Sequence, residues 1–332
     1  NYLIFPEGTR SKKGNEMLEF HHGSFKCALK TKAPIVPVVF VNSFKVLDEK
    51  GCKPVNVQIH YLKPIYEEEY AGMKTNELAE LVKGRIEEVL KELDSIPDEV
   101  SDDETSGRVD LRDETIFTID GDDTKDIDDA IAIEKLENGH YKLGVHIADV
   151  SYYVKEGSPL DNEALERGTS VYLVDRVIPM LPHELSNGIC SLNPNVDRLT
   201  LSCVMEFDPE GKQVDYEIFQ SVINSKIQMT YKKVNSILED NKVPEGYEDY
   251  AEHLRTMNEL AKILRKAKEK RGYIDFEVDE AKILVDENCV PTEVVLRDRG
   301  TGERLIEDFM IADGVYKEEA EKLYKKLRFR LK

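Results

Sequence analysis

The sequence predicts two domains in series, an α/β part followed by a mixed α+β part. A chain of 332 residues is long enough for two domains. Residues 1–96 carry 14 Lys and Arg against 14 Asp and Glu, whereas the remainder carries 32 against 52, so the whole net charge of −20 lies after residue 96. Residues 95–108 (SIPDEVSDDETSGR) are polar and acidic, which is typical of a linker. We therefore expect domains at 1–94 and 109–312.

The first part combines strand-like runs with one amphipathic helix. Strands are expected at Tyr2–Phe5, Ile35–Val41 and Val55–Leu62, the last of which alternates as VNVQIHYL. Residues 75–93 (TNELAELVKGRIEEVLKEL) place apolar side chains three or four positions apart, which predicts a helix with one buried face.

The second part begins with strands and continues into helices. Strands are expected at Thr115–Ile119, Ala130–Glu134 and Tyr141–Ile147. Ala251–Arg271 has a helical apolar stripe and is followed by Gly272, a common residue after a helix end. Residues 313–332 predict a basic helical tail.

Composition disfavours a membrane-spanning segment and a zinc site. The longest strongly apolar run, Ala33–Val41, is too short to cross a bilayer, and the chain does not open on a signal peptide. The five cysteines are isolated, which is typical of reduced thiols in the cytoplasm. Because the sequence opens without methionine on a strand-like run, we expect it to begin within a domain.

Residues 118–134 (TIDGDDTKDIDDAIAIE) hold six aspartates between Asp120 and Asp129. Two carboxylates about 5 Å apart repel by about 1 kcal/mol in water and by about 3 kcal/mol in a partly buried site. A solvated loop tolerates the weak repulsion in water, whereas a partly buried pocket tolerates the stronger repulsion only when it holds a cation. An EF-hand is excluded, because the positions that need Gly and Glu are Lys125 and Ile131 when the loop starts at Asp120.

The spacing of these aspartates favours a strand, a loop and a second strand. Asp120 would end the first strand, Asp128 and Asp129 would open the second, and Asp126 would lie between them. Because such a chain doubles back, the four side chains could converge on one or two Mg²⁺ ions, which activate water and stabilise the leaving oxygen of a phosphodiester. The spacing alone allows a solvated acidic loop equally well, and this alternative stays open.

Longer motifs extend this pattern. They are GRVDLRDETIFTIDGDDTKDIDDAIAIE, VHIADVSYYV, GTSVYLVDRVIPMLPHELSNGICSLNPNVDRLTLS, MTYKKV, RGYIDFEVDEAKI and RLIEDFMIA. Together, over about Ile96 to Ala312, the sequence resembles the ribonuclease II/ribonuclease R (RNB) family. The resemblance implies a Mg²⁺-dependent 3′→5′ exoribonuclease that hydrolyses single-stranded RNA to nucleoside 5′-monophosphates.

The resemblance also assigns roles to residues. It implies that Asp120, Asp126, Asp128 and Asp129 form the metal site, with Asp120 and Asp129 as direct ligands and Asp128 as a catalytic residue. Asp122 and Asp123 match no catalytic position and are interpreted as solvated.

Two tyrosines match the family's RNA-binding positions. Tyr172 matches a tyrosine that stacks on RNA near its 3′ end, and Tyr231 matches one that positions the terminal base. Stacking suits an enzyme that tolerates any sequence. The alternative for either tyrosine is a packed core residue.

Some features depart from the family pattern. The arginine- and histidine-rich segment expected beyond Ala312 and the flanking OB-fold domains are absent from the sequence. The strong acidity also contrasts with the basic surface of most RNA-binding proteins. A local basic run, interpreted as the solvated face of a helix, consists of Lys262, Arg265, Lys266, Lys268, Lys270 and Arg271.

The first ninety residues resemble a different family. NYLIFPEGTRS, HHGSFKCALK and APIVPVVFV are similar to the glycerolphosphate acyltransferases, most closely those acting on 1-acylglycerol-3-phosphate. The resemblance implies that Glu7, Gly8, Thr9 and Arg10 bind the phosphate of the acyl acceptor, with lysophosphatidate or acyl-CoA as partner and peripheral association with a membrane. None of the seven histidines is followed five residues later by aspartate, so the family's His-x₄-Asp catalytic pair is missing.

The sequence thus predicts an α/β acyltransferase fragment followed by a mixed α+β RNB-type catalytic domain, both truncated. Three functions stay open: an exoribonuclease or its metal-binding core, an acyltransferase lacking its catalytic base, and a fusion product with neither activity.

Overall fold

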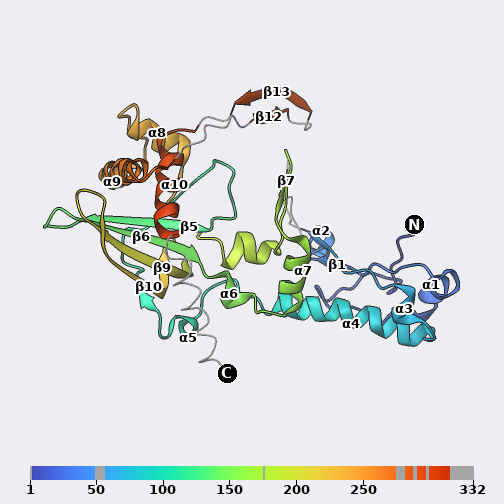
Figure 1. Ribbon diagram of the computed structural model, residues 1–332. Helices are drawn as coiled ribbons and strands as arrows, with labels where there is room; N and C mark the ends of the chain where they lie inside the picture. The colour runs from blue at the N-terminus through green and yellow to red at the C-terminus, as the bar shows by residue number, and fades with distance from the viewer. Residues whose placement is uncertain are drawn as a thin grey trace. The chain divides into compact units, whose positions relative to one another are not determined.

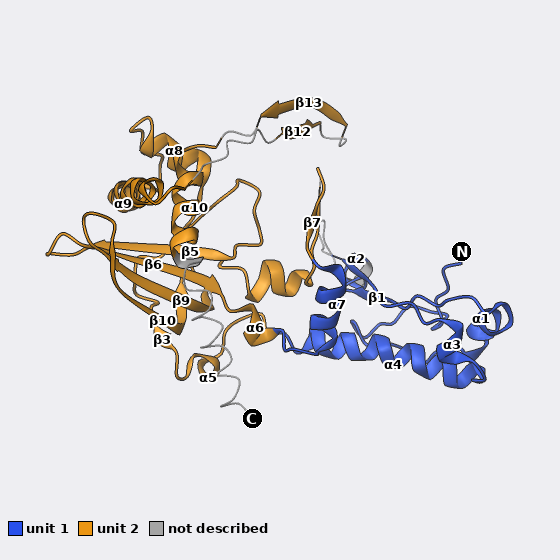
Figure 2. Ribbon diagram, viewed as in Figure 1, with its two compact units in different colours: residues 1–96, 154–168 blue, residues 97–153, 169–332 orange. Residues whose placement is uncertain are grey.

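The computed structural model describes residues 2–48, 57–174, 176–273, 281–286, 290–296 and 299–314 (Figure 1). The chain forms two compact units (Figure 2). Unit 1 comprises residues 1–96 and 154–168, and unit 2 comprises residues 97–153 and 169–332. The segment Val154–Gly168 therefore groups with the N-terminal part, although the sequence placed it in the second domain.

Unit 1 combines a two-stranded antiparallel ladder with a long helix. Its elements are η1 (His22–Phe25), α1 (Lys26–Thr31), β1 (Val38–Val41), α2 (Lys45–Asp48), β2 (Gln58–Tyr61), α3 (Glu67–Tyr70), α4 (Thr75–Asp94) and α7 (Pro159–Arg167). The helix predicted at residues 75–93 is confirmed as α4. Leu78, Val82, Ile86 and Leu90 recur along its inner face and are buried, because their spacing keeps them on one side of the helix.

The strand predicted at Tyr2–Phe5 is wrong. This segment is irregular and its large side chains are exposed. Apolar composition does not make a strand where no neighbouring strand supplies a ladder and no core covers one face. The strand predicted at Ile35–Val41 is shorter than expected, since β1 begins only after Pro37, which has no backbone N–H to donate. Of the strand predicted at Val55–Leu62, β2 covers Gln58–Tyr61, and residues 55–56 lie outside the described residues.

Unit 2 is built around a five-stranded sheet in the order β3-β10-β9-β6-β5. Its strands are β3 (Val109–Asp110), β5 (Asp129–Lys135), β6 (Tyr141–Ala148), β9 (Asp197–Phe207) and β10 (Gln213–Asn224). Neighbouring strands are antiparallel except β3, which runs parallel to β10. Three two-stranded ladders complete the unit: β4 (Thr118–Asp120) with β11 (Gln228–Thr230), β7 (Val171–Tyr172) with β8 (Val177–Ile178), and β12 (Ala281–Val285) with β13 (Pro291–Leu296).

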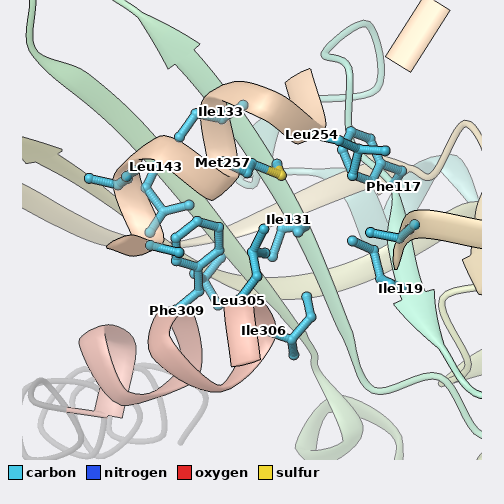
Figure 3. Packing of buried hydrophobic residues seen from close by; sticks show 14 of the residues in the cluster. Phe117, Ile119, Ile131, Ile133, Leu143, Leu254, Met257, Leu305, Ile306 and Phe309 are labelled. Atoms are coloured by element: carbon cyan, nitrogen blue, oxygen red, sulfur yellow. The ribbon is translucent and has the colours of Figure 1, made fainter. Parts of the chain in front are cut away.

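Helices cover one face of this sheet and form the main core with it. The helical elements of unit 2 are α5 (Asp102–Thr105), α6 (Val150–Tyr153), η2 (Glu184–Ile189), α8 (Tyr231–Leu238), η3 (Glu248–Tyr250), α9 (Ala251–Lys270) and α10 (Thr301–Gly314). Figure 3 shows Leu254 and Met257 of α9 and Phe309 of α10 packing with Ile131 of β5 and Leu143 of β6. A smaller cluster lies apart from this core and consists of Ile116, Ile127, Ala130, Ala148, Leu192 and Ile223.

Most expected elements of unit 2 are confirmed to within one residue. These are β5, β6 and α9, predicted at 130–134, 141–147 and 251–271. The strand predicted at Thr115–Ile119 starts later, as β4. The expected linker 95–108 contains the single-turn helix α5, whose first N–H groups are capped by Ser101 and Glu104.

Helix α10 ends at Gly314, and residues 315–332 of the expected basic tail lie outside the described residues. None of the helices in the described ranges combines the length and the apolarity needed to cross a bilayer.

We predict that Phe309→Ala lowers the free energy of unfolding of unit 2 by about 3–5 kcal/mol, because it leaves a cavity where α10 meets the sheet. Phe309 is 0% exposed, whereas Ile311 on the same helix is 39% exposed. Ile311→Ala is therefore the matched control, and we expect a much smaller loss. Urea unfolding followed by circular dichroism measures both changes, and equal losses would contradict the packing assigned to α10.

Candidate metal and RNA-binding site

The acidic loop joins β4 to β5 in the way the sequence predicts. Asp120 is the last residue of β4 and Asp129 the first of β5. Phe117 and Ile131 exchange two backbone hydrogen bonds of 3.1 and 2.9 Å, so the two segments run antiparallel. Continuing this register by three residues brings Asp120 level with Asp128. The chain therefore doubles back and returns the aspartates to the same end of the two strands.

The middle of the loop is held by its backbone. Ile127 is fully buried in the smaller cluster. Its N–H donates to the Ser191 hydroxyl at 3.1 Å, and its carbonyl accepts from the N–H of Leu192 at 2.9 Å. The carbonyl of Asp128 accepts from the N–H of Ala148 at 2.9 Å. These bonds engage only the backbone of the loop and none of its carboxylates.

Burial and mutual repulsion raise the pKa of three aspartates. Burial, followed by the charges of Asp129, Asp128 and Asp126, raises the pKa of Asp120 to about 7. Burial and then Asp128 raise the pKa of Asp129 to about 6. Although the side chain of Asp128 is exposed at its surface, desolvation by the surrounding protein and the charge of Asp126 raise its pKa as well.

Four of the six aspartates fall into two clear groups. Asp122 and Asp123 are exposed, as expected for solvated residues. Asp120 and Asp129 are half-buried and lie close enough to other carboxylates for their charges to interact.

Buried oxygen atoms without hydrogen-bond partners lie beside Asp120. The Asp120 Oδ2 atom is buried and makes no hydrogen bond, and the same holds for the hydroxyls of Thr118 and Thr230. Thr118 and Asp120 lie on the same side of β4, and Thr230 is the partner of Asp120 in the parallel β4–β11 ladder. An unpaired buried oxygen is unfavourable unless a water or a cation satisfies it. Carboxylate and hydroxyl oxygens are hard ligands, so this set fits Mg²⁺ chemically.

The expected convergence of four carboxylates on one point is not seen. In the part of the chain that the structure describes, no three His, Cys, Asp or Glu side chains form a ready ligand set. The structure thus shows the four aspartates on one clamped loop, and the metal site itself stays a prediction.

Tyr172 lies against the acidic loop. It belongs to β7, its side chain is 67% exposed, and its hydroxyl donates to Asp126 Oδ2 at 2.9 Å. That hydrogen bond, followed by burial, raises the pKa of Tyr172. One edge of the phenol is therefore fixed at the carboxylates while much of the ring remains open to a stacking partner.

Tyr231 is placed differently. It begins α8, directly after Thr230, and its half-buried ring packs against the main core and close to Gly302 of α10. The chain therefore places Tyr231 one residue beyond the ladder partner of Asp120. Its packing agrees in part with the alternative of a core residue.

The basic run on α9 is only partly a solvated face. Arg265 and Lys268 both donate to the buried carboxylate of Asp308 on α10, at 2.5 and 3.0 Å. For these two residues the interpretation as solvated side chains is wrong, because their charges offset that of Asp308 between the two helices.

The PEGTR stretch of unit 1 forms a tight turn. Gly8 has φ +68°, a conformation that favours glycine, and its N–H donates to the carbonyl of Phe5 at 3.1 Å. The carboxylate of Glu7 accepts from the N–H of Leu18 at 3.2 Å, whereas Thr9 and Arg10 are exposed. The His21 ring lies against Gly8, so closely that a Cβ there would meet it at 2.8 Å.

Residues that hold the loop were not found from the sequence. Ser191 and Thr230 lie 60 or more residues from the aspartates, and neither belongs to a charge cluster or a spacing motif. The only available signal was the long match across SNGICSLNP and MTYKKV, which carries no role for either residue.

Comparison with known families divides the chain in two. The RNB domain family matches residues 108–316, more than half of the chain. The acyltransferase family matches only residues 2–41.

Relatives of the second part are bacterial ribonucleases R. Ribonuclease R 1 of Lactococcus lactis is 55% identical over 225 residues, which are 68% of this chain and 28% of the relative. Ribonuclease R of Thermotoga maritima is 56% identical over 226 residues, 68% of this chain and 32% of the relative. The Escherichia coli protein is 42% identical over 241 residues, 72% of this chain and 29% of the relative. The chain thus spans about a third of the length of these relatives.

Solved structures agree with this relationship. Mycoplasma genitalium RNase R in complex with ribose methylated single-stranded RNA is similar with a TM-score of 0.64 and 28% identity, over 77% of this chain and 40% of that one. Yeast Ssd1, a pseudonuclease, shares the fold with a TM-score of 0.52 and 22% identity, over 70% of this chain and 28% of that one. The match over residues 108–316 and these likenesses together establish that the chain belongs to the RNB domain family.

Proposed function

We propose that this chain carries the metal-binding core of a Mg²⁺-dependent 3′→5′ exoribonuclease that hydrolyses single-stranded RNA to nucleoside 5′-monophosphates. The observation that carries the proposal is the clamped acidic loop, with an unpaired buried oxygen on Asp120 and the Tyr172 hydroxyl bound to Asp126. The ribonuclease R relatives and the RNA complex of the Mycoplasma genitalium protein support it.

Asp120, Asp126, Asp128 and Asp129 would hold the metal. When bound, Mg²⁺ supplies an activated water and a positive charge at the leaving oxygen of the phosphodiester. The chain's own contribution is positional: the backbone bonds at Ile127 and Asp128 keep the carboxylates at one edge. The exposed Tyr172 ring offers a stacking surface that accepts any base.

The N-terminal part favours a second candidate, the binding of a phosphate-bearing acyl acceptor. The glycine turn at Gly8 and the exposed Arg10 support it, because a guanidinium pairs well with phosphate. Lysophosphatidate with acyl-CoA is the substrate pair to test. We expect binding without acyl transfer, since no histidine of the sequence has an aspartate at the fifth following position.

We predict that Asp128→Asn abolishes RNA trimming, because it removes a carboxylate charge with almost no change in volume. The loss should be at least about 100-fold, in the range of a lost electrostatic group in an active site. The assay is the shortening of 5′-labelled single-stranded RNA with Mg²⁺, with EDTA as the metal-free control.

Asp122→Asn is the matched variant, because this aspartate lies in the same loop but matches no catalytic position of the family, and it should trim like the unmodified chain. Trimming that survives in Asp128→Asn would place the chemistry elsewhere. RNA binding without trimming in the unmodified chain would favour a non-catalytic RNA-binding protein.

We predict that Tyr172→Ala weakens binding of single-stranded RNA by about 1–3 kcal/mol, the contribution of one stacked base. Tyr172→Phe keeps the ring and loses only the bond to Asp126, so its affinity for RNA should stay near that of the unmodified chain. Fluorescence anisotropy in EDTA measures both affinities without hydrolysis. Equal weakening in both variants would show that the hydroxyl and not the ring binds RNA.

We predict that Asp120 makes the metal-free protein less stable as pH rises from about 4 to about 7. Its pKa is about 7 in the folded chain and about 4 in the unfolded chain. Between these pH values the folded state binds more protons than the unfolded state, so the stability of the fold decreases as the pH rises. Asp120→Asn should therefore gain more stability over the unmodified chain at pH 8 than at pH 5, in urea unfolding with EDTA. A difference that does not change with pH would contradict the raised pKa.

A further inference from the structure

The acidic loop is held on both sides of Asp126 by a single side chain. Ser191 is fully buried, and its hydroxyl donates to the carbonyl of Lys125 at 2.7 Å. The same oxygen accepts from the N–H of Ile127 at 3.1 Å. The two bonds close a ring around Asp126, so the backbone on either side of this aspartate is fixed to one atom.

Ser191 is itself fixed from behind. Its carbonyl accepts from Nε of the buried Arg198 at 2.8 Å, and the same guanidinium donates to the carbonyl of Gly188 at 3.1 Å. A chain of contacts therefore runs from Arg198 through Ser191 to the backbone around Asp126. It continues from the Asp126 carboxylate to the Tyr172 hydroxyl at 2.9 Å.

We propose that Ser191 is a positioning residue, which presents Asp126 to the metal and to Tyr172 by clamping the backbone on both sides of it. This inference rests on the proposed function, since it concerns the same acidic loop. Its physical basis is that carboxylates crowded on one loop repel one another, and only a fixed backbone keeps them close enough to share a cation. Neither bond requires substrate or metal to form.

The Ser191 hydroxyl can be removed without a change of charge and with the loss of only one oxygen atom. Ser191→Ala leaves the Ile127 N–H and the Lys125 carbonyl without their partner, while the cluster around Ile127 stays apolar. A buried serine that merely filled space would lower stability on removal and leave metal affinity unchanged. Metal affinity therefore separates a positioning role from a structural one.

Ser221→Ala is the matched control. Ser221 is equally buried, but it lies on β10, and its hydroxyl is hydrogen-bonded to those of Thr200 and Ser202 on β9, at 2.7 and 2.5 Å. Ser191→Cys is the second variant, because a thiol of similar shape keeps the packing and forms only weak hydrogen bonds.

The experiment measures the dissociation constant of Mn²⁺ for the whole chain, with Mn²⁺ as the only added metal. Electron paramagnetic resonance quantifies the unbound ion. We expect Ser191→Ala to weaken Mn²⁺ binding about 10- to 100-fold, the range for residues that orient metal ligands. Ser191→Cys should fall between Ser191→Ala and the unmodified chain, and Ser221→Ala should bind like the unmodified chain. Hydrogen exchange of the Ile127 amide should accelerate in Ser191→Ala alone.

The outcomes separate this inference from the proposed function. Unchanged Mn²⁺ affinity in folded Ser191→Ala or Ser191→Cys overturns the positioning role and leaves the proposed function standing. Equal weakening in Ser191→Ala and Ser221→Ala also overturns it, because the loss would follow stability alone. An unmodified chain that binds no Mn²⁺ overturns the proposed metal site, and the role of Ser191 with it.

Discussion

Repulsion among the carboxylates of the acidic loop is the constraint on which the candidate site depends. Burial, followed by the charges of neighbouring carboxylates, raises the pKa of Asp120, Asp128 and Asp129, so crowding these side chains on one loop is unfavourable. The backbone opposes this repulsion. Burial of Ile127 and the backbone hydrogen bonds to Ser191, Leu192 and Ala148 hold the loop in place.

The main core supplies the platform for this arrangement. Ile119 and Ile131 lie on either side of the loop and both point into the core beneath α9 and α10 (Figure 3). Because side chains alternate along a strand, burying Ile119 turns its neighbour Asp120 to the opposite side. The same residues that stabilise unit 2 therefore decide which way the first aspartate points. Arg265 and Lys268 of α9 both bind Asp308 of α10, which links the two helices that cover this core.

The two compact units do not follow the boundary of the RNB match. The segment Val154–Gly168 lies within the RNB match yet groups with unit 1, where the N–H of Leu160 donates to Glu92 of α4 at 3.1 Å. The fold is shared by yeast Ssd1, which is a pseudonuclease. Fold alone therefore does not decide activity, and the residues on the acidic loop must carry the argument.

The sequence by itself located some of the helices and strands and singled out the acidic loop as the candidate site. Periodicity located α4, α9, β5 and β6, because these segments bury one regular face. Through motifs long enough to indicate the family, the sequence predicted metal-site roles for Asp120, Asp126, Asp128 and Asp129 and none for Asp122 and Asp123. It did not locate the long β9–β10 hairpin, and it wrongly expected a strand at Tyr2–Phe5, where apolar residues find no partner strand.

Only the tertiary structure decided what surrounds the aspartates. Ser191, Thr230 and Tyr172 come from distant parts of the chain, and no local pattern links them to Asp120 or Asp126. The tertiary structure also showed that Arg265 and Lys268 on α9 both bind the buried carboxylate of Asp308 on α10. The physical reason is that sequence periodicity reports which face of an element is buried, whereas hydrogen-bond partners depend on which elements meet. Packing of the whole core decides which elements come into contact.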